Sequence, residues 1–292
     1  MDRGAFLAIG FIAAAAALAA LAKPKTDDGR VRTLAGGPFE ASGATEAPGG
    51  GVLFIDDSRP DAVLWMSLGA DGAPQAAPVA IPMGATISDP EGITSDGTHV
   101  YVVGSQSRGK HAGLVRFRFD AKSRRAEDAE TIADLESLLA GKAPALREGD
   151  RKAAALNIEG LAWDAKGRRL LLGLRAPLDA NHALVVPLSL RDPGGAFEDA
   201  NLEVGSPIRV DLGGSGIRSI EADGTGSYLI IAGGVTDAGT SRLVRWDGRG
   251  SGVQLVATLP RHLKPEGVVR TRVGSKDMTL VLCDSSRYLL MD

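Results

Sequence analysis

The sequence repeats a short pattern along most of its length. Each copy begins at a short motif such as Pro-Glu-Gly, continues through a turn rich in Asp and Gly, and returns as an apolar run. Pro90–Ser105 and Ile158–Gly173 are the clearest copies. One anchor position can be chosen in each of the five copies: Ser42, Glu91, Glu159, Arg218 and Glu266. The anchors lie 48 to 68 residues apart, close to the period of about 40–50 residues expected of four-stranded propeller blades.

Each copy predicts a small antiparallel sheet. After the first two strands of the second copy, apolar residues within 115–119 alternate with arginines, as in a strand with one buried face. A fourth strand follows in four copies, whereas the last copy reaches Asp292 on its third. Residues 30–34 resemble the outer strand at 254–259, so we expect them to complete the last blade. Such closure removes the exposed edges of an open sheet.

The sequence therefore predicts an all-β fold, a five-bladed β-propeller of four-stranded antiparallel blades closed by an N-terminal strand. Six blades is the alternative, and it requires the insert at about 135–155 to hide further strands. We interpret this insert as a surface helix followed by a charged, alanine-rich loop. Asp134 is expected to cap the helix and Gly141 to end it, with Leu135, Leu138 and Leu139 on one face.

The N-terminal segment predicts export. Ala5–Leu21 is an apolar run of 17 residues that follows a short basic head, and Ala20-Leu21-Ala22 fits a small-x-small cleavage pattern. We therefore interpret residues 1–22 as a signal peptide and residues 23–292 as one propeller domain, periplasmic or secreted. The alternative is an uncleaved anchor in the inner membrane with the propeller facing the periplasm, because 17 residues is near the minimum for a span.

Charge and cysteine content exclude several classes of protein. The chain has 33 Lys and Arg against 36 Asp and Glu, a net charge of −3, so no broad basic field exists to bind nucleic acid. A single cysteine excludes internal disulfides and multi-cysteine metal sites. We expect a monomer whose partner is a small anionic molecule, with membrane contact only through an uncleaved N-terminal segment.

Charged residues are predicted to gather at one mouth of the channel. In a four-stranded blade the innermost strand begins on the same rim where the second strand ends. The first set of candidates therefore comprises the five anchors already named. The second set lies at the exits of the second strands: Asp56, Asp57, Ser105, Arg175 and Asp284.

Three glutamates converging on one axis would repel one another unless they are neutralised. A hard cation such as calcium could do this with Glu91, Glu159 and Glu266 as ligands. Arg175 and Arg218 could instead pair with the glutamates, and water filling the channel is a third solution. Alternatively, Glu-Gly at a blade start is purely structural, accepting backbone N–H bonds while the glycine allows close approach.

Several motifs resemble those of a known bacterial family. They are Asn157-Ile158-Glu159-Gly160-Leu161, the run Gly173–Leu178, Gly216-Ile217-Arg218-Ser219-Ile220 and Pro265-Glu266-Gly267. On these the sequence is similar to the family of domain of unknown function 3616, which has no assigned reaction. More distantly it resembles phytase-like and esterase-like propellers, which implies calcium-assisted phosphoester chemistry at an acidic channel mouth. Their ligand sets do not transfer residue by residue to this sequence.

Two functions follow as hypotheses. The first is an exported, metal-assisted hydrolase of small anionic esters or phosphoesters, in which Glu159, Arg175 and Arg218 are catalytic. Its ligand-binding residues are Glu91, Glu266, Asp57, Asp284 and Ser105. The second is a non-catalytic propeller that uses the same face to bind a ligand or a protein.

Arginine breaks the pattern of repeated acids at position 218, and such departures tend to mark functional positions. If Arg218 is partly solvated, its replacement by Gln is expected to change stability by no more than about 1 kcal/mol.

Overall fold

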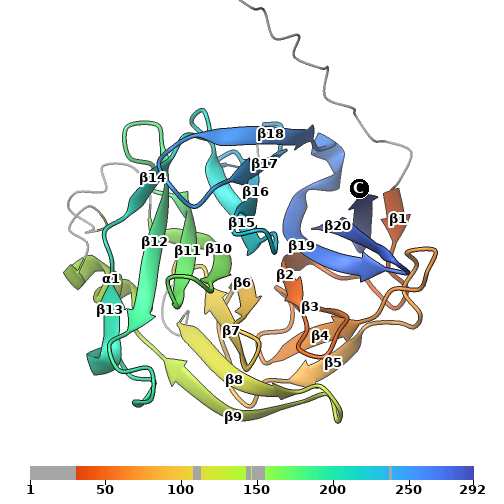
Figure 1. Cartoon of the computed structure of the whole chain (residues 1–292), viewed down its shortest axis with the longest axis horizontal. Coiled ribbons are helices and arrows are strands. Elements are labelled where there is room, and N and C mark those ends of the chain that lie inside the picture. Colours follow the sequence, from red (N-terminus) through yellow and green to blue (C-terminus); the bar gives the residue numbers. More distant parts are fainter. Residues whose placement is uncertain (1–30, 108–112, 143–145, 147–154, 237–238) are drawn as a thin grey trace, which may run out of the picture.

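The computed structural model describes residues 31–107, 113–142, 146, 155–236 and 239–292. Five antiparallel sheets stand around a central axis like the blades of a propeller (Figure 1). The innermost strand of each blade contacts the innermost strands of its neighbours, so the ring is complete. The prediction of five blades is confirmed, and the six-bladed alternative is wrong.

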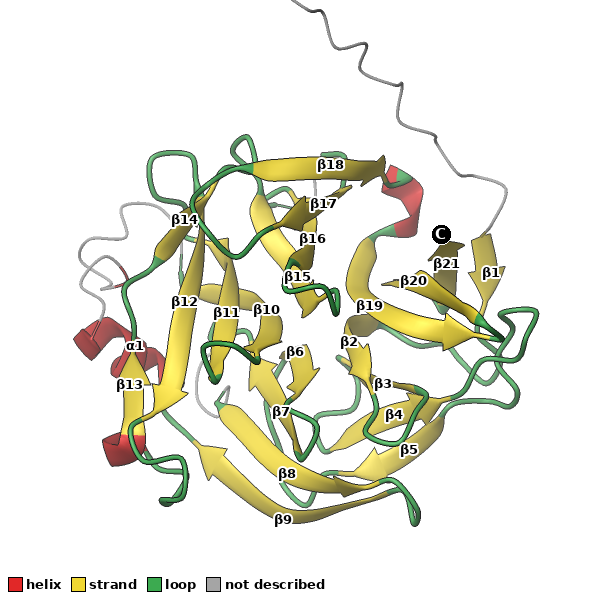
Figure 2. Cartoon of the chain, viewed as in Figure 1, coloured by secondary structure: helices red, strands yellow, loops and turns green. Residues whose placement is uncertain are grey.

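In blades 1, 2 and 4 the strands follow one another outward in chain order, as the strand labels show (Figure 2). Blade 1 contains β2 (Ala41–Glu46), β3 (Val52–Asp56), β4 (Ala62–Met66) and β5 (Val79–Pro82). Blade 2 contains β6 (Pro90–Ser95), β7 (His99–Gly104), β8 (Leu114–Asp120) and β9 (Arg125–Ile132). Blade 3 contains β10 (Asn157–Asp164), β11 (Arg169–Ala176), β12 (Ala183–Leu190), β13 (Leu202–Val204) and β14 (Ile208–Val210). Blade 4 contains β15 (Gly216–Ala222), β16 (Tyr228–Gly233), β17 (Arg242–Trp246) and β18 (Val253–Thr258).

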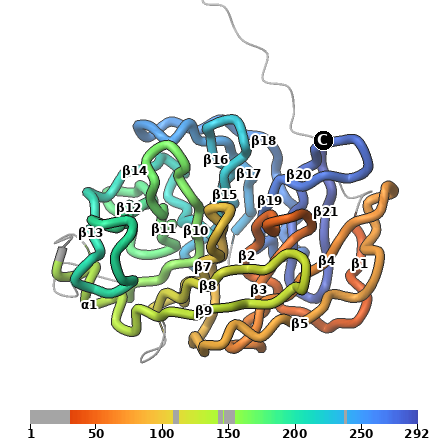
Figure 3. The backbone as a smooth tube through the Cα atoms, turned by 60° about the horizontal axis from the view of Figure 1, so that its bottom comes forward, coloured from red at the N-terminus to blue at the C-terminus, as the bar shows by residue number. Residues whose placement is uncertain are grey.

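Blade 5 joins the two ends of the described chain. It contains β19 (Pro265–Val273), β20 (Lys276–Cys283), β21 (Arg287–Met291) and the N-terminal β1 (Val31–Thr33). In its register Val31 faces Leu289 and Thr33 faces Arg287. Leu34 follows the strand and is buried. The two strands lie side by side in both orientations of the molecule (Figures 1 and 3). The predicted closure by an N-terminal strand is therefore confirmed.

The hydrophobic core is divided between the blades. Each of five clusters of buried side chains contains residues from two neighbouring blades. Each blade packs one face of its sheet against each neighbour, so both faces are buried. Tyr101 and Leu172, for example, belong to the cluster between blades 2 and 3. Packing between neighbouring blades therefore positions the innermost strands around the channel mouth.

Blade 3 departs from the predicted pattern. One outer strand was expected at about 207–212, but the structure has two short ones that pair with different halves of β12. Between β12 and β13, residues 191–201 leave the blade and return through the short 3-10 helix η3 (Asp199–Asn201). This excursion lies over the outer side of blades 2 and 3 (Figure 2).

The predicted helix is present as α1 (Leu135–Lys142), and the Asp134 carboxylate accepts a hydrogen bond from the Ser137 N–H at 3.0 Å. Leu135 and Leu139 are buried in the cluster between blades 2 and 3. The helix continues through Gly141, so the expected stop at that residue is wrong. A second short 3-10 helix, η4 (Arg261–Leu263), precedes β19.

Two predicted segments lie wholly or partly outside the described residues. The signal peptide or anchor at 1–22 is one, and most of the loop that follows α1 is the other. Within the described part of the chain, no helix combines the length and apolar character needed to cross a bilayer.

Candidate functional site

A β-bulge at the start of each blade places the anchor residues. The antiparallel register between the first two strands shifts at the same point in all five blades. In blades 2 to 5 the residue skipped by the ladder is Glu91, Glu159, Arg218 or Glu266. A bulge turns a side chain away from the regular alternation of the strand. The repeated motif therefore directs one polar side chain per blade out of the sheet.

The glycine after the anchor has a packing role. A Cβ added to Gly92 would lie 2.8 Å from the Cβ of Leu161, and one added to Gly160 would lie 2.8 Å from Ile220. Both partners belong to the innermost strand of the next blade. Neighbouring innermost strands therefore approach closely only because glycine stands here, as the structural interpretation of Glu-Gly predicted.

A polar pocket of about 480 Å³ lies where these side chains converge. Residues from all five blades line it, which places it on the axis of the ring. Seven acids line this mouth pocket: Glu40, Asp57, Asp89, Glu91, Glu159, Glu266 and Asp284. Its basic residues are three: Arg175, Arg218 and Lys264. The lining therefore carries four more acidic than basic side chains.

Eight of the ten predicted positions line the mouth pocket and two do not. The Ser105 hydroxyl donates a hydrogen bond to the Asp89 carboxylate, but Ser105 itself is not part of the lining. Asp56 is fully buried behind the pocket, where one carboxylate oxygen accepts hydrogen bonds from the Ser58 N–H and hydroxyl. Both occupy strand exits, where the twist of the blade decides whether a side chain faces the axis.

Sequence reasoning missed five residues of the lining: Glu40, Ala41, Ser58, Asp89 and Lys264. Three of them share a signal, because each stands two residues before an anchor. The equivalent position of blade 3 is Asn157, whose amide donates to Glu159 at 3.2 Å. Polar residues therefore repeat at this position in four of the five blades.

Ion pairs join the charged residues of the mouth pocket, among them Lys264 with Asp284 at 3.2 Å. A guanidinium N–H of Arg175 donates to one oxygen of Glu159 at 2.7 Å, and its Nε donates to the carbonyl of Gly234 at 3.2 Å. Arg218 donates to both oxygens of Glu266, at 2.6 Å for Oε2, and lies 3.9 Å from the second oxygen of Glu159. Glu159 and Glu266 are thus neutralised by arginine, which reduces the repulsion between the glutamates. This is one of the three solutions that the sequence left open.

Glu91 has no such partner. Among the described residues, no hydrogen bond or ion pair is found for its carboxyl group, although the group lies in the pocket lining. Burial raises the pKa of Glu91 well above its usual value, and the nearby charges of Glu159, Asp57 and Asp89 raise it further. The acidic excess of the mouth pocket is therefore concentrated around Glu91.

Two other carboxyls of the lining also hold their protons strongly. Burial raises the pKa of Asp57 to about 6, although the hydroxyl of Ser42 donates to its carboxylate. Burial likewise raises the pKa of Glu266 to about 7 against the opposing effect of Arg218. The pocket thus changes its charge in the neutral range of pH.

The described residues do not form a ready metal site. Among them, no group of three or more His, Cys, Asp or Glu side chains is placed to hold a metal ion. Of the three glutamates predicted as calcium ligands, Glu159 and Glu266 face guanidinium groups instead. Calcium prefers six to eight oxygen ligands, so this arrangement does not fit it.

Deeper in the channel, sequence reasoning missed a buried acid. Glu221 lies on β15, and its two carboxyl oxygens are 2.7 Å and 3.2 Å from the hydroxyls of Thr45 and Thr94. Burial raises the pKa of Glu221 to about 8 despite these hydrogen bonds. A charged residue three positions after the anchor, where the other blades have Thr45, Thr94, Ala162 and Val269, was the signal that could have revealed it.

Replacement of Arg218 by Gln is expected to lower the free energy of unfolding by about 3 kcal/mol at pH 8. Arg218 is only 8% exposed, so the earlier expectation of a mild effect was based on the wrong environment. Removing it takes the paired guanidinium away from Glu266, while Glu159 keeps Arg175, and breaking a buried pair in this way is costly. The loss should be smaller at pH 5, where Glu266 can take up a proton.

Urea unfolding at both pH values measures this effect. Arg209→Gln is the matched control, because it removes an arginine from an exposed ion pair with Asp179. Such pairs contribute no more than about 1 kcal/mol. Equal losses for the two variants at pH 8 would contradict a structural role for the Arg218 ion pair.

Comparison with known proteins finds a family model that matches part of the chain and solved structures of low similarity. Residues 144–276 match the model of a family described as "Protein of unknown function (DUF3616)", so the resemblance predicted from the sequence motifs is confirmed over that stretch. No curated protein matches the sequence.

Similar solved structures include a Carbohydrate-Active Enzymes Family AA12 protein from Trichoderma reesei, at 10% identity and a TM-score of 0.49, covering 91% of this chain and 96% of that one. The PQQ-bound aldose sugar dehydrogenase from Streptomyces coelicolor has 15% identity and a TM-score of 0.45, covering 89% and 96%. These values are too low to transfer chemistry to this chain.

Proposed function

We propose that the chain is a rigid binding propeller whose mouth pocket takes a small molecule carrying a positive charge. The observation that carries the proposal is the Glu91 carboxyl, which is half-buried, lines the pocket and has no hydrogen bond or ion pair among the described residues. A positive group placed beside it would relieve its repulsion with Asp57, Asp89 and Glu159. An organic ammonium group fits this role, because it donates hydrogen bonds to several carboxylates at once.

The positions of the arginines favour binding of a cation over hydrolysis of an anion. An anionic ester would enter a pocket with four more acidic than basic side chains. The ester could bind an arginine only after the hydrogen bonds between Arg175 and Glu159, or between Arg218 and Glu266, had broken. Because both arginines already bind carboxylates, the contacts support the non-catalytic alternative more than the metal-assisted hydrolase.

Export remains part of the proposal. The apolar segment at 5–21 predicts it, and cell fractionation with a C-terminal tag tests it. A periplasmic or secreted form that starts near residue 23 is the expected result, whereas a cytoplasmic, full-length form would contradict it.

Putrescine, a small diamine, is a suitable probe for the mouth pocket. In calorimetric titrations at pH 7.5 we expect saturable binding at one site per chain. Glu91→Gln should weaken the affinity at least tenfold, because the neutral amide removes the charge that faces the ammonium group. Glu203→Gln, which changes an exposed acid outside the pocket, is the matched control and should bind as the parent does.

Two further measurements separate the proposal from its rivals. Calcium chloride in place of putrescine tests the metal site predicted from the sequence, and calcium binding that Glu91→Gln abolishes would favour that site over an amine site. A panel of esterase and phosphatase substrates tests catalysis, and turnover that Glu159→Gln abolishes would contradict a purely binding role. Absence of putrescine binding to the parent would overturn the proposal.

A further inference from the structure

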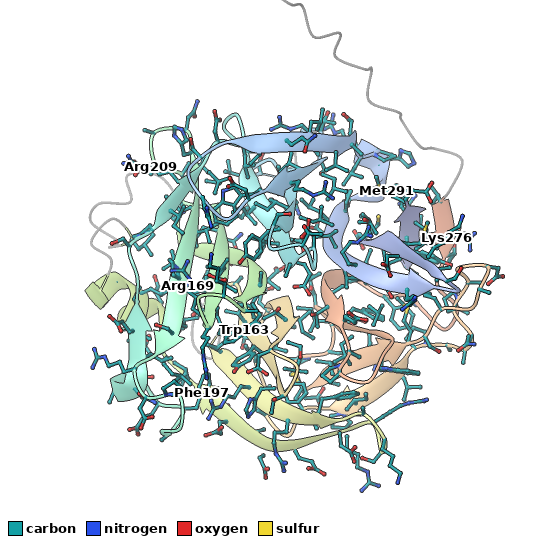
Figure 4. All side chains as sticks on the ribbon, viewed as in Figure 1. Trp163, Arg169, Phe197, Arg209, Lys276 and Met291 are labelled. Atoms are coloured by element: carbon teal, nitrogen blue, oxygen red, sulfur yellow. The ribbon has the colours of Figure 1, made fainter. Side chains whose placement is uncertain are left out.

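A second pocket, also of about 480 Å³, opens between blades 2 and 3 at the opposite rim from the mouth pocket. Its lining includes residues at the turn ends of the innermost hairpins, whereas the mouth pocket lies at their starts. Figure 4 labels two of its aromatic residues, Trp163 and Phe197, on the face toward the viewer. Nothing in the proposed function involves this second pocket.

Aromatic and leucine side chains form its body. Tyr101 and Trp163 have nearly parallel rings, 4° apart in plane, with centroids separated by 6.2 Å. Phe197 lies beside them, with its ring centroid 6.3 Å from that of Tyr101. Leu188 and Leu202 are buried at the same pocket. A flat apolar molecule can cover these surfaces, as aromatic groups do in most small-molecule sites.

The aromatic lining arises where the repeat is broken. Trp163 stands four residues after the anchor of blade 3, where blades 2, 4 and 5 have Ser95, Ala222 and Arg270. Phe197 belongs to the excursion between β12 and β13. Departures of this kind tend to occur at functional positions, because a packed repeat does not require them.

Trp163 also differs from the other tryptophans in its hydrogen bonding. The indole N–H of Trp65 donates to the carbonyl of Gly50, and that of Trp246 donates to the carbonyl of Gly250. For Trp163 no hydrogen bond is found within the described part of the chain, although its ring is half-buried. It therefore offers a donor at the edge of an apolar surface.

The charged groups of the second pocket favour an anion. Asp96 is satisfied locally: it accepts from the Tyr101 hydroxyl at 2.8 Å and from the backbone N–H groups of Thr98 and His99. Arg116 donates to Glu130 at 2.6 Å and lies over the ring of Phe197.

Arg168 is exposed at the pocket rim, at the tip of the turn between β10 and β11. Arg116 is already paired with Glu130 and Asp96 with local donors, so a carboxylate in this pocket would be balanced by the exposed guanidinium of Arg168.

We propose that this second pocket binds a small aromatic carboxylate. The arene would lie against Trp163, Tyr101 and Phe197, while the carboxylate would accept hydrogen bonds from the Trp163 N–H and Arg168.

Titration with 1-naphthoate tests the proposal. Three indole N–H signals are expected in the nitrogen-15 spectrum, one for each tryptophan, and only that of Trp163 should shift as the naphthoate saturates one site. Calorimetry should show affinity at least tenfold lower in Trp163→Ala, because the stacking surface is lost. Trp65→Ala, in a half-buried tryptophan outside the pocket, is the matched control and should bind as the parent does.

The charge is tested separately. Arg168→Gln changes an exposed turn residue and keeps the fold, yet it should weaken naphthoate binding at least threefold. It should leave the weaker binding of neutral 1-naphthalenemethanol unchanged. Arg249→Gln, at another exposed turn, is the control and should leave both affinities unchanged. The proposal is overturned if the parent shows no saturable binding, or if Trp163→Ala binds the naphthoate as tightly as the parent.

Discussion

The protein is expected to lose stability as the pH rises from about 5 to about 8. Glu221, Glu266 and Asp57 have pKa values raised to about 8, 7 and 6 by burial. In this range the unfolded chain has released the corresponding protons, because ordinary carboxyls titrate near pH 4. The folded protein therefore binds more protons than the unfolded chain, and raising the pH favours unfolding.

Glu221 should contribute most of this trend. Its share of the loss in unfolding free energy between pH 5 and pH 8 is about 3 kcal/mol, since each unit of pKa difference corresponds to about 1.4 kcal/mol. Glu221→Gln keeps a neutral hydrogen-bonding group beside Thr45 and Thr94 at every pH. It should therefore flatten the pH profile and raise stability at pH 8 by a similar amount, with little change at pH 5.

Urea unfolding of parent and variant from pH 5 to pH 8 provides the measurement. Glu203→Gln, in an exposed acid on β13, serves as the control and should reproduce the slope of the parent. Parallel profiles for parent and Glu221→Gln would contradict the protonated state of this buried acid.

Deletion of residues 1–38 is expected to lower the melting temperature by about 10 °C. It removes β1, which leaves the edge of β21 unpaired, and it removes Leu34 from the core cluster between blades 5 and 1. Loss of a buried leucine side chain alone costs about 2–5 kcal/mol, and about 1 kcal/mol shifts the midpoint by roughly 2–4 °C in a chain of this size.

A chain that begins at Arg30 retains β1 and is the reference for the deletion. Leu34→Asp in that reference chain tests the buried side chain without removing the strand. A melting temperature that is the same for the reference chain and the deletion would show that ring closure by β1 adds nothing to stability.

The fold could be predicted because each blade is defined locally. An apolar strand, a turn rich in Asp and Gly and an alternating third strand recur with the same order, and strand order in a propeller follows chain order. Five blades need five outer strands, and only four follow their own blade in the sequence. Residues 30–34 could therefore be assigned as the outer strand of the last blade. This closure was the only pairing between distant parts of the chain that had to be predicted.

The blade 3 excursion could not be predicted in the same way. Residues 191–201 contain no strand pattern, and their position depends on Phe197 packing against side chains of blade 2. Such contacts join residues about 80–100 positions apart in sequence, and the repeat gives no indication of them. The second pocket could therefore not be predicted from the sequence.

The mouth pocket was predicted in composition but not in pairing. The repeat located Glu91, Glu159, Arg218 and Glu266, because the bulge recurs in each blade. Which acid each arginine reaches depends on the length of the side chain and on the angle between blades. The sequence allowed Arg175 and Arg218 to serve any of the three glutamates, whereas the geometry leaves Glu91 out.

Proton release on putrescine binding shows whether the amine sits beside the Glu91 carboxyl. If the amine binds beside a Glu91 that is protonated in the free protein, binding must displace that proton. Calorimetry at pH 6.5 in two buffers of different ionisation enthalpy counts the protons released. We expect proton release on binding, an affinity that rises with pH, and a reduction of both effects in Glu91→Gln, where only Asp57 and Glu266 remain to release protons in this range. Binding that releases no proton and has the same affinity from pH 6 to pH 8 would contradict a protonated Glu91 at the amine site.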